Sequence, residues 1–197
     1  MAAELLIKAL QAIWNALRSM NIPAAVMGGL AMSLWKYPRA TRDVVLLIGI
    51  ETRQLNKILL HLQALGFRPK HSPPIMPLGQ LNIIQMLYEP SEAFMEVQID
   101  LLLAETNYLR TALERRISTQ LPDISIETAV LTCEDLILHK LLAGRLIDRA
   151  DIAALLKLNR ASLDRHYLAY WANQLQLAAE FVFIWHESLP DEPIPAN

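Results

Sequence analysis

The feature that most constrains the fold is an apolar run, residues 44–50, that begins directly after a carboxylate, Asp43. Such a run, rich in branched residues and without charge, is typical of a strand buried on both faces. It follows a glycine pair, Gly28-Gly29, and a basic turn that contains Arg39. Backbone N–H groups at a glycine turn suit phosphates, and an acid at a strand end suits a metal ion. This order of features favours a nucleotide site.

The composition limits the number of domains and the classes of partner and site that the chain can have. The chain has 197 residues, 53% of them hydrophobic, which is enough for one domain or one and a half. A net charge of −2 does not favour nucleic acid as a partner through bulk electrostatics. The single cysteine, Cys133, excludes an internal disulfide and a Cys–Cys zinc site. Residues 1–20 carry an acid and no cleavage pattern, and no run is typical of a membrane span, so we expect a soluble, cytoplasmic protein.

The apolar periodicity separates the chain into two halves. It predicts strands over residues 24–27, 44–50, 81–88 and 95–103, a short edge strand over 124–126, a loop over 68–78, and helices over 3–20, 30–36, 51–65 and 107–118. After Thr132 it predicts only helices, over 134–144, 149–158 and 163–188. The predicted fold class is α+β, with a small mixed sheet flanked by helices. We expect an α/β domain over 1–130, a helical region over 131–189 packed on it, and a disordered tail over 190–197.

Two acids on apolar strands are the first candidate site residues. Side chains alternate along a strand, so positions 43 and 45 share one face, and an acid at each would address one ion. The chain has Asp43 and Val45 there. Asp100 lies within a second apolar strand, and such an acid needs a partner. It is either a metal ligand or a strand-end acid that meets a lysine or arginine, and the sequence leaves both open.

A helix later in the chain carries the candidate cation. Lys140 lies among leucines and alanine, and Arg145 and Asp148 follow one and two turns later. Its ammonium group would either face a triphosphate as a point charge or pair with Asp148 or Asp135 inside a helix bundle.

These motifs, taken in order, resemble the nucleotidyltransferase superfamily related to DNA polymerase beta. The resemblance covers about residues 20–157, and is greatest to the bacterial branch that holds the minimal nucleotidyltransferases and the AbiE-type toxins of toxin–antitoxin systems. The positions that carry it are Gly28-Gly29-x-Ala31, Arg39-x-Thr41-x-Asp43, Asp100, Asp135, Lys140, Arg145, Asp148 and Asp151. The resemblance implies a small mixed sheet flanked by helices, with a C-terminal helical region as the other wall of a cleft.

The implied reaction is transfer of a nucleoside monophosphate from a nucleoside triphosphate to a hydroxyl of a protein or an RNA such as tRNA, with two Mg²⁺ ions. By resemblance, Asp43 would bind both metals and Asp100 the metal that activates the hydroxyl. Lys140 would neutralise the triphosphate. The remaining positions expected to contact the nucleotide or orient these groups are Gly28, Gly29, Arg39, Thr41, Arg145 and Asp148.

Val45 departs from the family pattern, which has a second acid at that position. Either the chain keeps Mg²⁺-dependent nucleotide binding with impaired transfer, or Glu96 or Gln98 compensates, or Val45 was introduced to silence the enzyme. The alternative function is a non-catalytic binding module, for instance in a toxin–antitoxin pair or as a homo-oligomeric scaffold. A plain α/β domain with fortuitous motifs is the third hypothesis. The expected partners are a nucleoside triphosphate, a protein or tRNA acceptor and a cognate toxin or antitoxin, but no membrane.

Overall fold

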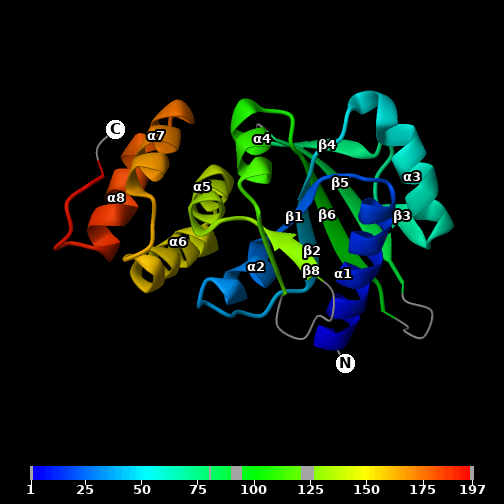
Figure 1. Cartoon of the computed structure of the whole chain (residues 1–197), viewed down its shortest axis with the longest axis horizontal. Helices are drawn as coiled ribbons and strands as arrows, with labels where there is room; N and C mark the ends of the chain where they lie inside the picture. Colours follow the sequence, from blue (N-terminus) through cyan, green and yellow to red (C-terminus); the bar gives the residue numbers. More distant parts are fainter. Residues whose placement is uncertain (1, 80, 90–94, 121–126, 196–197) are drawn as a thin grey trace. The chain divides into compact units, whose positions relative to one another are not determined.

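A mixed eight-stranded sheet, built from the first 130 residues, organises the chain. The computed structural model describes residues 2–79, 81–89, 95–120 and 127–195. The sheet order is β3-β5-β6-β2-β1-β8-β7, and β4 also pairs with β5 (Figure 1). Its strands are β1 (Ala24–Met27), β2 (Asp43–Ile48), β3 (Phe67–Pro69), β4 (Ile75–Leu78), β5 (Leu81–Tyr88), β6 (Val97–Leu103), β7 (Ile117–Gln120) and β8 (Glu127–Val130). The pairs β2–β6 and β1–β8 are parallel, and the other pairs are antiparallel.

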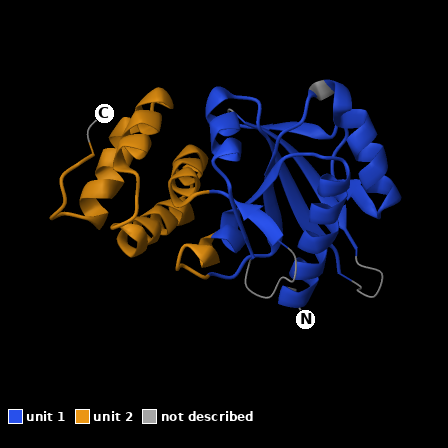
Figure 2. Ribbon diagram, viewed as in Figure 1, with its two compact units in different colours: residues 1–31, 39–131 blue, residues 32–38, 132–197 orange. Residues whose placement is uncertain are grey.

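The chain divides into two compact units, residues 1–31 with 39–131 and residues 32–38 with 132–197 (Figure 2). The helices before residue 130 are α1 (Ala2–Ser19), α2 (Gly28–Leu34), the 3₁₀ turn η1 (Thr52–Gln54), α3 (Leu55–Ala64) and α4 (Asn107–Glu114). The second unit adds α5 (Cys133–Ala143), α6 (Leu146–Asn159), α7 (Arg165–Gln174) and α8 (Ala178–Ser188). None of the helices in the described ranges has the length and apolarity needed to cross a bilayer.

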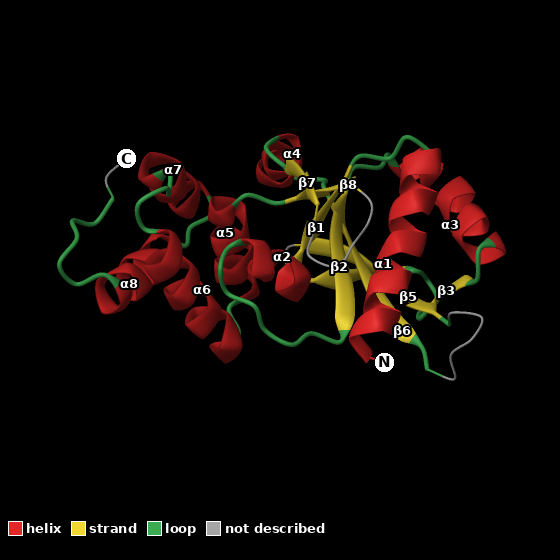
Figure 3. Cartoon of the chain, turned by 60° about the horizontal axis from the view of Figure 1, so that its bottom comes forward, coloured by secondary structure: helices red, strands yellow, loops and turns green. Residues whose placement is uncertain are grey.

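One face of the sheet is closed by helices. Val44, Leu46 and Ile48 alternate along β2 and are fully buried, as are Ile99 and Leu101 on β6. Helix α1 packs on both strands, and α3 lies beside it (Figure 3). Burial of such a face is the main favourable term in folding, so it fixes the register of the strands. The alternate side chains of β2 and β6 therefore point to the opposite face.

Two helices of the second unit, α5 and α7, begin at a side-chain cap. Thr132 caps α5 by accepting a hydrogen bond from the Asp135 N–H, and Gly144 ends this helix in the left-handed conformation. Asp164 caps α7 in the same way as Thr132 caps α5.

Burial raises the pKa of Cys133 to about 12, so its thiol is not a reactive thiolate.

Three predictions about the elements were wrong. Residues 68–78 are not only loop, because β3 and β4 lie there. Pro69 and Pro77 fit these strands because only one side of an edge strand is hydrogen-bonded. The helix predicted over 163–188 is two helices, separated near Gln176, whose φ of 60° is left-handed. The helix predicted over 107–118 ends at Glu114, and β7 follows it. The edge strand predicted over 124–126 lies outside the described residues.

Buried His139 on α5 makes the fold acid-sensitive. Burial lowers the pKa of His139 to about 4, because the charged imidazolium loses its hydration. Below pH 6.5 the unfolded chain binds a proton that the folded chain does not, so stability falls as the pH decreases from 6.5 towards 4. Between pH 6.5 and 5 the loss is about 2 kcal/mol.

We therefore expect His139→Leu to flatten the decrease in unfolding free energy between pH 6.5 and 5, measured by urea unfolding with tryptophan fluorescence. The exposed histidine of α8, His186, supplies the control, His186→Leu, which should keep the wild-type slope. Identical slopes for wild type and His139→Leu would contradict this assignment.

Candidate functional site

Asp43 and Asp100 lie on neighbouring parallel strands and share one face of the sheet. In the register of β2 and β6, Asp43 is opposite Gln98 and Val45 is opposite Asp100. The two carboxylates are thus diagonal neighbours on the face that the helices α1 and α3 do not close. Both residues are half-buried.

The electrostatics of Asp100 reflect this arrangement. Burial raises the pKa of Asp100, hydrogen bonds from Gln98 and Gln85 partly oppose this, and the negative charge of Asp43 raises the pKa further. The positive charge of Lys70 acts in the lowering direction. The net result is a pKa above the usual value for an aspartate.

Each carboxylate is held through one oxygen. The Thr41 hydroxyl donates to Asp43 Oδ1 at 2.5 Å. The side-chain amides of Gln98 and Gln85 donate to Asp100 Oδ1 at 2.9 and 3.2 Å. Among the described residues, no hydrogen bond reaches Oδ2 of either aspartate. The site thus presents one carboxylate oxygen from each strand to an incoming ligand.

A second layer of contacts holds the glutamines. Lys70 Nζ donates to Gln98 Oε1 at 2.8 Å, and His71 Nε2 lies 2.9 Å from Gln85 Oε1. Sequence reasoning missed Gln85, Lys70 and His71. The sequence shows one glutamine within each of two largely apolar strands, β5 and β6. Only the pairing of these strands shows that Gln85 and Gln98 both lie beside Asp100.

The glycine pair packs tightly beside the same strand. A Cβ on Gly28 would lie 3.1 Å from Val45 Cγ2, and Gly28 has a φ of +66°, which favours glycine. A Cβ on Gly29 would lie 2.6 Å from Thr41 Cβ. Any larger residue at position 29 would displace Thr41 and, with it, the hydrogen bond to Asp43. This is a packing role, and the predicted phosphate contact of these glycines stays a prediction.

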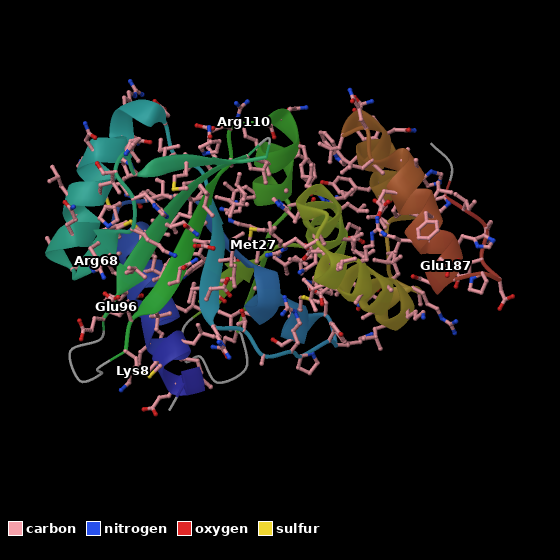
Figure 4. The ribbon with its side chains drawn as sticks, turned by 180° about the vertical axis from the view of Figure 1, so that it is seen from behind. Lys8, Met27, Arg68, Glu96, Arg110 and Glu187 are labelled. Carbon is pink, nitrogen blue, oxygen red and sulfur yellow. The ribbon has the colours of Figure 1, made fainter. Side chains whose placement is uncertain are left out.

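Neither Glu96 nor Gln98 supplies a free carboxylate in place of the acid that the family pattern has at position 45. Glu96 pairs with Arg68, with Nη2 and Oε1 2.5 Å apart, at the end of the sheet where Figure 4 labels both residues. Gln98 donates to Asp100 and supplies no charge. No cluster of three or more acids, histidines or cysteines suited to a metal occurs within the described ranges. A divalent cation here would have two carboxylates and would take its other ligands from water or a bound phosphate.

Lys140 is engaged within the second unit. Its side chain is 6% exposed, and Nζ donates to Asp148 at 2.8 Å and to Asp151 at 2.5 Å. Arg145 Nε donates to the other oxygen of Asp148 at 2.7 Å. Burial acts to raise the pKa of Asp148, but the hydrogen bonds and charges of Arg145 and Lys140 lower it overall. Lys140 thus forms the buried ion pair that was its alternative interpretation, and its contact with a triphosphate stays a prediction.

The remaining expected contact, Arg39, is half-buried, and Nη1 reaches the Ala40 carbonyl oxygen at 3.5 Å. It lies in the turn before β2, as does Thr41, in the same unit as both aspartates.

No protein-family model matches the chain, and no curated protein matches it. Solved structures do. The antibiotic-resistance factor ANT(2'')-Ia is 14% identical with a TM-score of 0.57, over 95% of this chain and 98% of that one. An antigenic nucleotidyltransferase-like protein from Paracoccidioides brasiliensis is 17% identical with a TM-score of 0.54, over 93% of each chain. The chain has a nucleotidyltransferase fold. A third neighbour, the lincosamide antibiotic adenylyltransferase LnuA, is 14% identical with a TM-score of 0.50, over 77% of this chain and 96% of that one.

Removing the Lys140 charge should destabilise the protein. Lys140→Met leaves Asp148 and Asp151 buried without their shared cation, and breaking such a pair costs about 3–5 kcal/mol. The free energy of unfolding, from urea denaturation, should fall by that amount. Lys157→Met, which alters an exposed lysine of α6, should leave it unchanged. Equal stability of the two variants would show that the ion cluster contributes nothing to the fold.

Proposed function

We propose that the chain binds a nucleoside triphosphate on the Asp43–Asp100 face and transfers its nucleoside monophosphate to a hydroxyl. The observation that carries the proposal is the pair of unbonded carboxylate oxygens, one from each of two parallel strands, on a nucleotidyltransferase fold. Acceptors proposed for this chain are a protein or tRNA hydroxyl and, by likeness to LnuA bound to lincomycin, a small-molecule hydroxyl.

Asp43 and Asp100 are the residues that would hold a divalent cation, with Mg²⁺ the expected ion. Such a cation supplies charge neutralisation at the phosphates. Because the described residues of this face offer two acids and not three, we propose that the ion would be bound together with the nucleotide.

The chain's own residues would orient the reaction. Thr41 fixes the rotamer of Asp43, and Gln85 and Gln98 fix that of Asp100, so that each Oδ2 is directed to the ligand. The acceptor hydroxyl oxygen forms a bond to the α-phosphorus, and the bond from that phosphorus to pyrophosphate breaks. The hydroxyl proton would pass to a water molecule, while Asp43 and Asp100 hold the cation that neutralises the phosphates.

A non-catalytic nucleotide-binding module is the second candidate, and Val45 favours it. Val45 lies opposite Asp100 in the register, where another acid would add a ligand. A toxin–antitoxin partner or a second copy of the chain would belong to this alternative.

Nucleotide binding is the first test. Isothermal titration with each of the four common nucleoside triphosphates at millimolar concentration and Mg²⁺ should show binding by the wild type. Asp43→Asn and Asp100→Asn should weaken it by about tenfold or more, equivalent to about 1.4 kcal/mol. Glu114→Gln, at an exposed acid of α4, is the matched control and should bind as the wild type does. Absence of binding by the wild type to all four nucleotides would contradict the proposal.

Replacement of Val45 separates transfer from binding alone. Val45→Asp adds a carboxylate opposite Asp100 and should increase the rate of label transfer from a radiolabelled triphosphate to an acceptor in a cell extract. Val45→Asn, which has nearly the same shape without the charge, should not. Transfer by the wild type supports the transferase, whereas transfer by Val45→Asp alone supports the binding module.

A further inference from the structure

A triphosphate brought to the Asp43–Asp100 face meets two negative charges, so its recognition calls for a cation on the same face. Lys140 was the expected cation, yet its ammonium group is buried between Asp148 and Asp151, which together offset its charge. Arg68, on β3 of the sheet, is paired with Glu96. The first unit holds further cations, among them Arg39 in the turn before β2 and Lys70 directly after β3.

Lys70 meets this requirement. It directly follows β3 and is exposed, and its backbone N–H donates to the Gln85 carbonyl oxygen at 2.8 Å. Its side chain crosses to β6, where Nζ donates to Gln98 Oε1 at 2.8 Å. The backbone of Lys70 is therefore bonded to β5 and its side chain to β6, and each of these strands carries a glutamine that donates to Asp100.

The charge of Lys70 is not offset by direct contact. Its bonding partner on the side chain is a neutral amide, and among the described residues no carboxylate oxygen lies within 4 Å of Nζ. An ammonium group has three N–H donors, and the bond to Gln98 uses one of them. The positive charge also reaches Asp100, where it acts to lower the pKa. Two donors of Lys70 therefore remain for a ligand near Asp100.

We propose that Lys70 binds the phosphates of the nucleotide, and that Gln98 holds its ammonium group in place for that contact. The inference rests on the proposed function and assigns the phosphate-binding cation of that site to the segment between β3 and β4, in the same compact unit as Asp43 and Asp100. In this arrangement Lys140 is a structural ion-pair residue of the second unit.

The test uses a ligand without a base. Binding of inorganic tripolyphosphate with Mg²⁺, and of the nucleosides alone, is measured by titration for the wild type, Lys70→Met, Lys70→Arg and the control Lys57→Met, at an exposed lysine of α3. Lys70→Met should lose about tenfold or more in affinity for tripolyphosphate and for the tightest-binding triphosphate, and keep its affinity for the nucleoside. Lys70→Arg should retain most of the affinity, and Lys57→Met all of it. Thermal unfolding of Lys70→Met should match the wild type, because the side chain is exposed.

The results distinguish the role of Lys70 from the proposed binding of nucleoside triphosphates. Wild-type affinity of Lys70→Met for tripolyphosphate, in a protein that binds nucleoside triphosphates, overturns the role of Lys70 and leaves the function standing. An equal loss of affinity for nucleoside and tripolyphosphate also overturns it. If the wild type binds no triphosphate, the function and the role of Lys70 fall together.

Discussion

The parallel pairing of β2 with β6 is the interaction on which the site depends. Its register places Asp43 opposite Gln98 and Asp100 opposite Val45, and the buried alternate residues prevent a shift by one position. Such a shift of β2 would turn Val44 and Leu46 to the face of Asp100 and would move Asp43 to the helix-covered face. The helix-covered apolar face therefore positions the carboxylates, although it contains none of the chemistry.

Burying the Asp100 carboxylate costs free energy, which the burial of the apolar face of the sheet offsets. Burial and the charge of Asp43 raise the pKa of Asp100, which means that the ionised form of Asp100 is disfavoured in the folded protein. Two glutamine amides reduce this cost by donating to Oδ1. A perturbed pKa of this kind is typical of sites that act on a ligand. Val45 avoids a further rise in the pKa of Asp100, because an acid at position 45 would add another negative charge.

The sequence predicts the local features of this arrangement and not the non-local ones. The apolar run after Asp43, the second acid at Asp100 and the change from a mixed to an all-helical part near residue 130 follow from periodicity, and the strands and helices confirm them. The contacts of Gln85, Lys70 and His71 depend on which strands are neighbours, and composition does not encode that. The break near Gln176 carries no glycine or proline as a local signal.

Proximity of the two carboxylates is measured most directly by titrating Asp100 in the presence and absence of the Asp43 charge. Carboxyl ¹³C chemical shifts followed by NMR report the pKa of Asp100 in the wild type and in Asp43→Asn. Because the negative charge of Asp43 raises the pKa of Asp100, its removal should lower that pKa. An unchanged pKa of Asp100 in Asp43→Asn would mean that the two acids do not face one ligand.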